Sequence, residues 1–84
     1  MTQIILVTSN QPTLRQSIHS TLTRAGYQVV EADNSQKALA ELQTRHHVDL
    51  LLLDVPLQDM DGIQLTRQIR DNATFRFLPI VYRH

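Results

Sequence analysis

The amino-acid sequence predicts an α/β protein with a doubly wound parallel sheet. Short apolar runs are typical of buried strands, and amphipathic stretches between them are typical of helices. Polar or glycine-containing turns separate each strand from the next helix. Runs and stretches alternate in the order β-α-β-α-β-α-β, which implies right-handed crossovers and helices on both faces of the sheet. The chain of 84 residues is expected to form one domain, residues 1–84.

The first half of the chain supplies two predicted strands and two predicted helices. The first strand is Ile4 to Val7, and the first helix begins at Pro12 and ends before Gly26, which suits a left-handed cap. One face of this helix carries Leu14, Ile18, Leu22 and Ala25. The second strand is predicted at Tyr27 to Val30. The second helix ends near Arg45 and His46, and its possible N-caps are Asp33, Asn34 and Ser35.

The second half contains the most hydrophobic segment of the chain. Val48 to Leu53 reads as a central strand with Asp54 at its carboxyl end. A loop from Val55 to Gly62 follows, and then a third helix that runs to about Asp71. After a connector, Asn72 to Phe77, the fourth strand is predicted at Leu78 to Tyr82.

The composition excludes several classes of function. The net charge is +0, so no basic surface for nucleic acid is indicated, and cysteine is absent, so neither a disulfide framework nor a thiolate metal site is expected. No apolar run approaches the roughly 20 residues of a membrane span. No secretion signal is visible at the N-terminus. We therefore expect a cytoplasmic protein that binds neither nucleic acid nor membranes.

Polar side chains gather where the predicted strands end. Ligands of open parallel sheets bind outside the carboxyl ends of the strands. That edge is expected to collect Thr8, Ser9, Asn10, Asp54 and His84. Asp54 follows four leucines, and a carboxylate at the rim of a dry sheet is costly unless it is used or hydrogen-bonded. From the residues alone, a functional aspartate and a solvated or N-capping one are both open interpretations.

Other polar residues have simpler interpretations. Asp59 and Asp61 precede the third helix and suit N-terminal capping. The neighbouring His46 and His47 suit a solvated helix end, and a solvated helix face is expected for Arg67 and Arg70. The only glycines are Gly26 and Gly62, so no glycine-rich phosphate loop exists.

Three segments together carry a resemblance to a known family. They are IILVTSNQPTLRQSIHSTLTRAGYQVVEADNSQKALAEL, VDLLLLDVPLQDMDGIQLTRQIR and FLPIVYRH. In this order they resemble a bacterial two-component response-regulator receiver domain. The resemblance implies a flavodoxin-like fold with strand order 2-1-3-4, and it covers about the first two-thirds of a receiver, without the last helix-strand-helix.

The resemblance also implies roles for individual residues. The phosphoacceptor position is Asp54, and the metal positions are Asp54, Ser9, Asn10 and the carbonyl of Pro56. The family has acids where this chain has Ser9 and Asn10, so Mg²⁺ binding is expected to be weak or lost. In the loop, Gln58 and Asp59 replace the usual proline and glycine. His84 falls at the switch position, where the family has a hydroxyl side chain.

Two functions from different classes follow from these departures. The first is a pseudo-receiver, without cofactor or enzyme activity, that acts by binding a histidine kinase or another signalling protein. The alternative is a response regulator that is phosphorylated on Asp54 by a histidine kinase; a remnant without function is a weaker third. An uncovered sheet face and an open fourth-strand edge predict a homodimer or a tight complex with another protein, with interface candidates Phe75, Phe77, Leu78, Ile80 and Tyr82. The alternative is a monomer in which the connector Asn72 to Phe77 and the tail Arg83 to His84 fold back as a cover.

Overall fold

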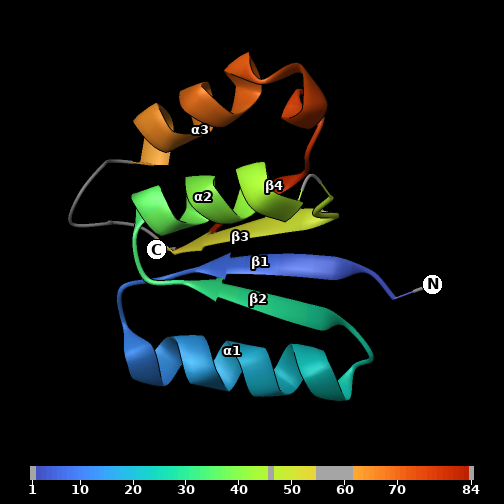
Figure 1. Cartoon of the computed structure of the whole chain (residues 1–84). Coiled ribbons are helices and arrows are strands. Elements are labelled where there is room, and N and C mark those ends of the chain that lie inside the picture. Colours follow the sequence, from blue (N-terminus) through green and yellow to red (C-terminus); the bar gives the residue numbers. More distant parts are fainter. Residues whose placement is uncertain (1, 46, 55–61, 84) are drawn as a thin grey trace.

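The structure is a computed structural model, and it describes residues 2–45, 47–54 and 62–83. Strands and helices alternate along the chain, as predicted (Figure 1). The elements are β1 (Ile4–Thr8), α1 (Pro12–Arg24), β2 (Gln28–Ala32), α2 (Ser35–Arg45), β3 (Leu50–Asp54), α3 (Gly62–Asp71), the short 3₁₀ helix η1 (Ala73–Phe75) and β4 (Ile80–Arg83). No helix within these residues has the length and hydropathy that a membrane crossing requires.

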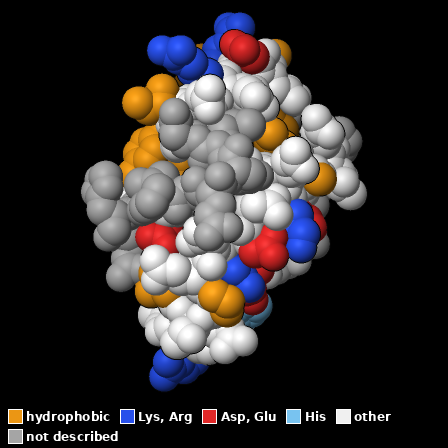
Figure 2. Space-filling model, turned by 90° about the vertical axis from the view of Figure 1, so that its left-hand side faces the viewer, with side chains coloured by type: hydrophobic (Ala, Val, Ile, Leu, Met, Phe, Trp, Pro, Cys, Tyr) orange, Lys and Arg blue, Asp and Glu red, His pale blue; other side chains and the backbone are white. Residues whose placement is uncertain are grey.

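The four strands form one parallel sheet in the order β2-β1-β3-β4, which confirms the predicted fold class and strand order. α1 lies on one face of this sheet, and α2 and α3 lie on the other (Figure 1). All strands end at the same edge, because parallel strands joined by crossovers run in one direction. This edge is on the left of Figure 1, and Figure 2 views the molecule from that side.

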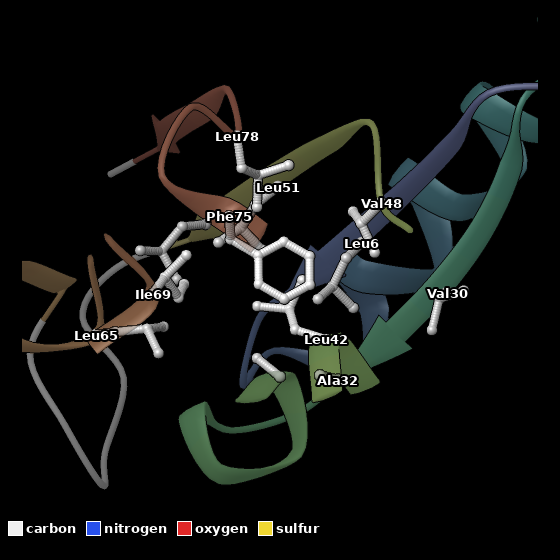
Figure 3. Close-up of a cluster of buried hydrophobic side chains, with 12 residues drawn as sticks. Leu6, Val30, Ala32, Leu42, Val48, Leu51, Leu65, Ile69, Phe75 and Leu78 are labelled. Atoms are coloured by element: carbon white, nitrogen blue, oxygen red, sulfur yellow. The ribbon is translucent and has the colours of Figure 1, made fainter. Parts of the chain in front are cut away.

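The hydrophobic core fills the space between the sheet and the α2–α3 layer. Phe75 lies in the middle of this cluster, and its ring points toward Leu6 and Leu42 (Figure 3). The full set of buried members is Leu6, Val30, Ala32, Ala38, Leu42, Val48, Leu51, Leu53, Leu65, Ile69, Phe75 and Leu78. Each buried leucine, isoleucine, valine or phenylalanine of this set contributes about 1.5–3 kcal/mol when it is removed from water, so this face holds most of the hydrophobic stabilisation.

The α1 face is covered only in part. α1 contacts β2 and β1, and beneath it Ile5 and Val7 are buried. No residue of α1 itself is buried. Leu50 and Leu52 of the central strand β3 remain half-buried, and Val81 of β4 is 46% exposed. The predicted exposure of apolar residues on this face is thus present in the described part of the chain.

Several predicted element boundaries were wrong by two residues or so. β3 begins at Leu50 instead of Val48, and β4 begins at Ile80 instead of Leu78. Val48 and Leu78 are nevertheless buried in the core, so hydrophobicity alone does not separate a strand from the buried residues that precede it. β2 is shifted to Gln28–Ala32.

Two turn residues behave as their chemistry predicts. Gly26 has a φ of 98° just after α1, a conformation that residues with a Cβ rarely adopt. The side chain of Asn34 accepts a hydrogen bond of 2.8 Å from the backbone N–H of Lys37, which identifies Asn34 as the N-cap of α2 among the three possible residues.

Candidate functional site

Asp54 lies at the carboxyl end of β3 and is only 3% exposed. The register of β1 and β3 pairs Thr8 with Leu53, so the residues that follow, Ser9 and Asp54, lie side by side. The Ser9 hydroxyl donates a hydrogen bond of 2.8 Å to Oδ2 of Asp54. The structure therefore brings together two of the predicted site residues, in direct contact and away from water.

Ser9 is held by three further hydrogen bonds. Its N–H donates to the carbonyl of Ala32 at 3.0 Å, and its Oγ accepts from the N–H of Gln11 at 3.1 Å. Its carbonyl accepts from Nη1 of Arg15 at 2.7 Å. The hydroxyl thus donates its one hydrogen to Asp54 of the neighbouring strand and accepts from the turn that starts α1, so its hydrogen is used within the fold.

Arg15 links this edge to a charged cluster under α1. Its Nε donates to Oε1 of Glu31 at 2.8 Å, and Nδ1 of His19 lies 2.5 Å from Oε2 of the same carboxylate. Burial raises the pKa of Glu31, but the hydrogen bonds from His19 and Arg15, together with their charges, outweigh burial and hold this pKa below its ordinary value. One carboxylate on β2 therefore holds two side chains of α1.

These donors make a poor magnesium site. Mg²⁺ prefers hard, charged oxygens in octahedral geometry. In the Ser9–Asp54 contact, only Asp54 supplies a charged oxygen, because the Ser9 hydroxyl is neutral. Across the described ranges, no three acidic, histidine or cysteine side chains are grouped so as to hold a metal. The Ser9 hydroxyl directs its hydrogen, not a free lone pair, at Asp54. The described residues do not fit the ion that the family resemblance implies.

Some predicted site residues lie outside the described residues. These are Pro56 with its carbonyl, Gln58, Asp59, Asp61, His46 and the switch position His84. Asn10 is described, and it is half-buried beside Ser9. Figure 2 faces this edge of the sheet, where acidic and basic side chains are interspersed. No single sign of charge dominates the visible, described part of the edge.

The predicted interface residues separate into two groups. The prediction that Phe75 and Leu78 lie at an interface was wrong, because both side chains are buried in the core of their own chain. Ile80 also packs against that core. Phe77 is 88% exposed and Tyr82 is 43% exposed. The Tyr82 hydroxyl also contacts the hydroxyl of Thr66 and so connects β4 with α3.

The prediction of a solvated helix face is wrong for one of the two arginines of α3. Arg70 is not simply solvated: its Nη1 donates to the carbonyls of Phe75 at 3.2 Å and Arg76 at 3.0 Å, which fixes the turn after η1. Arg67 is exposed, as expected. His47 is largely exposed, and its Nε2 lies 3.3 Å from Oδ1 of Asp49.

Glu31 was missed by sequence reasoning, although a signal existed. It interrupts the apolar series of β2 between Val30 and Ala32. A charge in a strand that a helix covers needs a partner, and this rule directs attention to the basic residues of the preceding helix. The choice of Arg15 and His19 among those residues depends on the packing of α1, which the sequence alone does not give.

Comparisons with known proteins agree with this geometry. The family model described as "Response regulator receiver domain" matches residues 5–82. The chain is 31% identical over 78 residues to the chemotaxis protein CheY1 of Helicobacter pylori, which covers 92% of this chain and 63% of that relative. The chain thus spans less than two-thirds of the length of this relative.

Solved structures show the same similarity. The chemotaxis response regulator CheY4 of Vibrio cholerae superposes with a TM-score of 0.92 at 28% identity, over 98% of this chain and 68% of that one. The response regulator TrrA of Thermotoga maritima, solved in complex with Mg²⁺ and BeF, has a TM-score of 0.77 at 28% identity, over 82% and 59% of the two chains.

Proposed function

We propose that this chain, which belongs to the family of response regulator receiver domains, is a pseudo-receiver: a two-component signalling module that acts by protein–protein interaction and takes no stable phosphoryl group. The observation that carries the proposal is the hydrogen bond from Ser9 to Asp54. At the position where the resemblance implies a metal-binding acid, this chain has a hydroxyl that is already used within the fold.

The chemistry of phosphoryl transfer supports this proposal. Such transfer depends almost entirely on positioning and on stabilisation of charge. Among the described residues, no other acidic side chains are grouped with Asp54 so as to hold a metal ion, and without a cation little offsets the charge of an incoming phosphoryl group. The chain keeps the aspartate and the fold around it, and these suffice for a surface that partners recognise.

We assign protein partners to this module, a histidine kinase or another signalling protein, and a cytoplasmic location. The net charge of +0 supports a protein partner over nucleic acid or an anionic membrane surface. The partly uncovered α1 face supports a second copy of the chain as one of the partners.

A phosphoryl analogue tests the proposed function. Beryllofluoride and Mg²⁺ are added to the ¹⁵N-labelled protein, and amide shifts are followed for residues near Asp54, with a receiver that has the full acidic set as positive control. A pseudo-receiver shows no saturable shifts. Saturable shifts centred on Ser9 and Asp54 overturn the proposal and favour the alternative, a response regulator phosphorylated on Asp54.

A further inference from the structure

We infer that Arg15 is a positioning residue for the Ser9–Asp54 contact. Its guanidinium, held by Glu31, fixes the backbone of Ser9 at the place from which the Ser9 hydroxyl reaches Asp54. The inference names what keeps the carboxylate of Asp54 paired within the fold, and it therefore rests on the pseudo-receiver proposed above. It links the state of the Asp54 edge to the charged pair between α1 and β2.

Ser9 is fully buried, and its polar groups have partners. The hydroxyl donates to Asp54 and accepts from the N–H of Gln11, while the backbone N–H donates to the carbonyl of Ala32. In the part of the chain that the structure describes, the carbonyl of Ser9 receives its hydrogen bond from Arg15, at 2.7 Å. A buried carbonyl without a donor is unfavourable, so the backbone would turn until another group or water satisfied it. The position of this backbone therefore depends on Arg15.

The guanidinium of Arg15 bridges two acceptors. Its Nε donates to Oε1 of Glu31 at 2.8 Å, and its Nη1 donates to the carbonyl of Ser9. The donors of a guanidinium point in fixed directions, so the bond with Glu31 also sets the direction of Nη1. The side chain of Arg15 is 17% exposed, so little water competes for these donors. The carboxylate of Glu31 thereby determines where Arg15 holds Ser9.

His19 holds the same carboxylate from the next turn of α1. Its Nδ1 lies 2.5 Å from Oε2 of Glu31, whereas Arg15 contacts Oε1. His19 and Arg15 are four residues apart, so both side chains lie on the side of the helix that faces β2. Although burial raises the pKa of Glu31, these two donors hold it below its ordinary value, so Glu31 is charged at neutral pH. A continuous series of contacts therefore runs from His19 on α1 to Asp54 on β3.

A simpler role, the attachment of α1 to the sheet, does not account for all of these contacts. No residue of α1 is buried, so the ion pair between Arg15 and Glu31 helps to hold the helix in place. That pair is sufficient for attachment. The additional bond from Nη1 to the Ser9 carbonyl is directed at the turn beside Asp54, and this bond is the one that a positioning role requires.

The lifetime of the Ser9 hydroxyl proton tests the inference. In an equal mixture of H₂O and D₂O, the ¹³Cβ signal of a serine is split when its hydroxyl proton exchanges slowly and is single when the exchange is fast. The protein is labelled with ¹³C-serine, and Ser9→Ala identifies the signal of Ser9. The parent chain is expected to give a split signal, because this hydroxyl is buried and bonded to the carboxylate of Asp54.

Arg15→Met keeps an aliphatic side chain and removes both bonds. It is expected to raise the exchange rate of the Ser9 hydroxyl proton at least about tenfold and to merge the split signal. Arg24→Met is the matched control, because Arg24 lies on the same helix and its Nε meets only the Ser20 carbonyl, at 3.4 Å. Gly26→Ala is a second control, because it strains the turn after α1 outside this series of contacts. Both controls are expected to keep the split signal, whereas a general loss of stability would merge it in every variant.

Glu31→Gln carries the same test if Arg15→Met does not fold. Glutamine keeps the shape of the side chain but offers one acceptor oxygen to the two donors of α1, so it holds Arg15 less firmly. Faster exchange of the Ser9 hydroxyl proton is therefore expected. Amide hydrogen exchange of Leu6 in β1 is measured for each variant to show that the sheet is intact.

A Ser9 signal that stays split in Arg15→Met, or in Glu31→Gln where that variant replaces it, overturns the inference. So does a single signal in the parent chain, or a signal that merges equally in Arg24→Met and Gly26→Ala. None of these readings measures phosphoryl binding, which the beryllofluoride experiment follows separately. Saturable beryllofluoride binding by the parent, together with a signal that merges in Arg15→Met alone, rejects the pseudo-receiver and retains the role of Arg15.

Discussion

The Ser9 hydroxyl donates a hydrogen bond of 2.8 Å to Oδ2 of Asp54 across the neighbouring strands β1 and β3. Both side chains are buried, so this bond is one of the polar contacts that make a buried carboxylate tolerable at the end of the sheet. The aspartate that the family resemblance identifies as the phosphoacceptor is therefore paired within the fold itself.

The first prediction restores the missing charges. The double substitution Ser9→Asp plus Asn10→Asp is expected to raise Mg²⁺ affinity at least about tenfold, since it supplies carboxylate ligands of the kind that Mg²⁺ prefers. Isothermal titration calorimetry with the parent and the double variant measures this change. A control with two exposed acids on α1, Ser20→Asp plus Thr23→Asp, should leave the affinity unchanged. Equal affinities for the parent and the restored site would show that another part of the site prevents binding.

The second prediction concerns the pH dependence of the Glu31 cluster. Because His19 and Arg15 hold the pKa of Glu31 below its ordinary value, the folded state stabilises the carboxylate. This contribution is fully present above the unfolded-state pKa near 4.5 and disappears as the pH falls through the lower folded-state value.

Glu31→Gln tests this linkage. At neutral pH the substitution is expected to lower the free energy of unfolding by about 1 kcal/mol. The value is modest because the side chains of Glu31, Arg15 and His19 are all partly exposed. The difference from the parent should shrink as the pH is lowered below about 4.5. Urea unfolding at several pH values measures it, with the exposed Asp71→Asn as control. If the difference in unfolding free energy between the parent and Glu31→Gln stays constant as the pH falls well below 4.5, the charge of the Glu31 carboxylate is not its cause.

The third prediction separates two phenylalanines that are close in sequence. Phe75 is buried in the core, whereas Phe77 is 88% exposed. Phe75→Ala is expected to lower the free energy of unfolding by about 3–5 kcal/mol, because it leaves a cavity among the core side chains. Phe77→Ala is the matched control, and a change within about 0.5 kcal/mol is expected. Comparable losses in chemical denaturation would contradict the placement of both rings.

The fourth prediction concerns the turn after α1. Gly26 has a φ of 98°, and a Cβ added at this position would meet no atom within 4 Å. Gly26→Ala is therefore expected to destabilise the fold by about 1–2 kcal/mol through backbone strain alone. Gly26→Asn should cost less, because asparagine tolerates this conformation better. Equal stability of the alanine and asparagine variants in thermal unfolding would show that the strain is relieved elsewhere.

The sequence contained enough information for the fold but not for the details of the site. The alternation of apolar runs and amphipathic stretches indicated the α/β class, and the family resemblance indicated the strand order. The start of β3 was missed because Val48 and Leu50 are both apolar, and burial does not require strand geometry. The interface residue Phe75 was misplaced because η1, a short turn within the expected connector, directs its ring into the core.

The Ser9–Asp54 contact was missed for a different reason. The sequence placed both residues at one edge of the sheet, but a hydroxyl beside a carboxylate is compatible with a bound ion or with a direct hydrogen bond. The hydrogen bond between Ser9 and Asp54 joins residues 45 positions apart, and it depends on the register of β1 and β3, which the sequence alone does not give.

Intact mass after incubation with a small phosphodonor and Mg²⁺ tests the central claim most directly. The parent chain and the Ser9→Asp plus Asn10→Asp variant are treated side by side, with Asp54→Asn as the negative control. The account predicts that the parent gains no mass and is indistinguishable from Asp54→Asn. A gain of one phosphoryl group on the parent, absent from Asp54→Asn, would contradict it and show that Asp54 accepts phosphate despite its contact with Ser9.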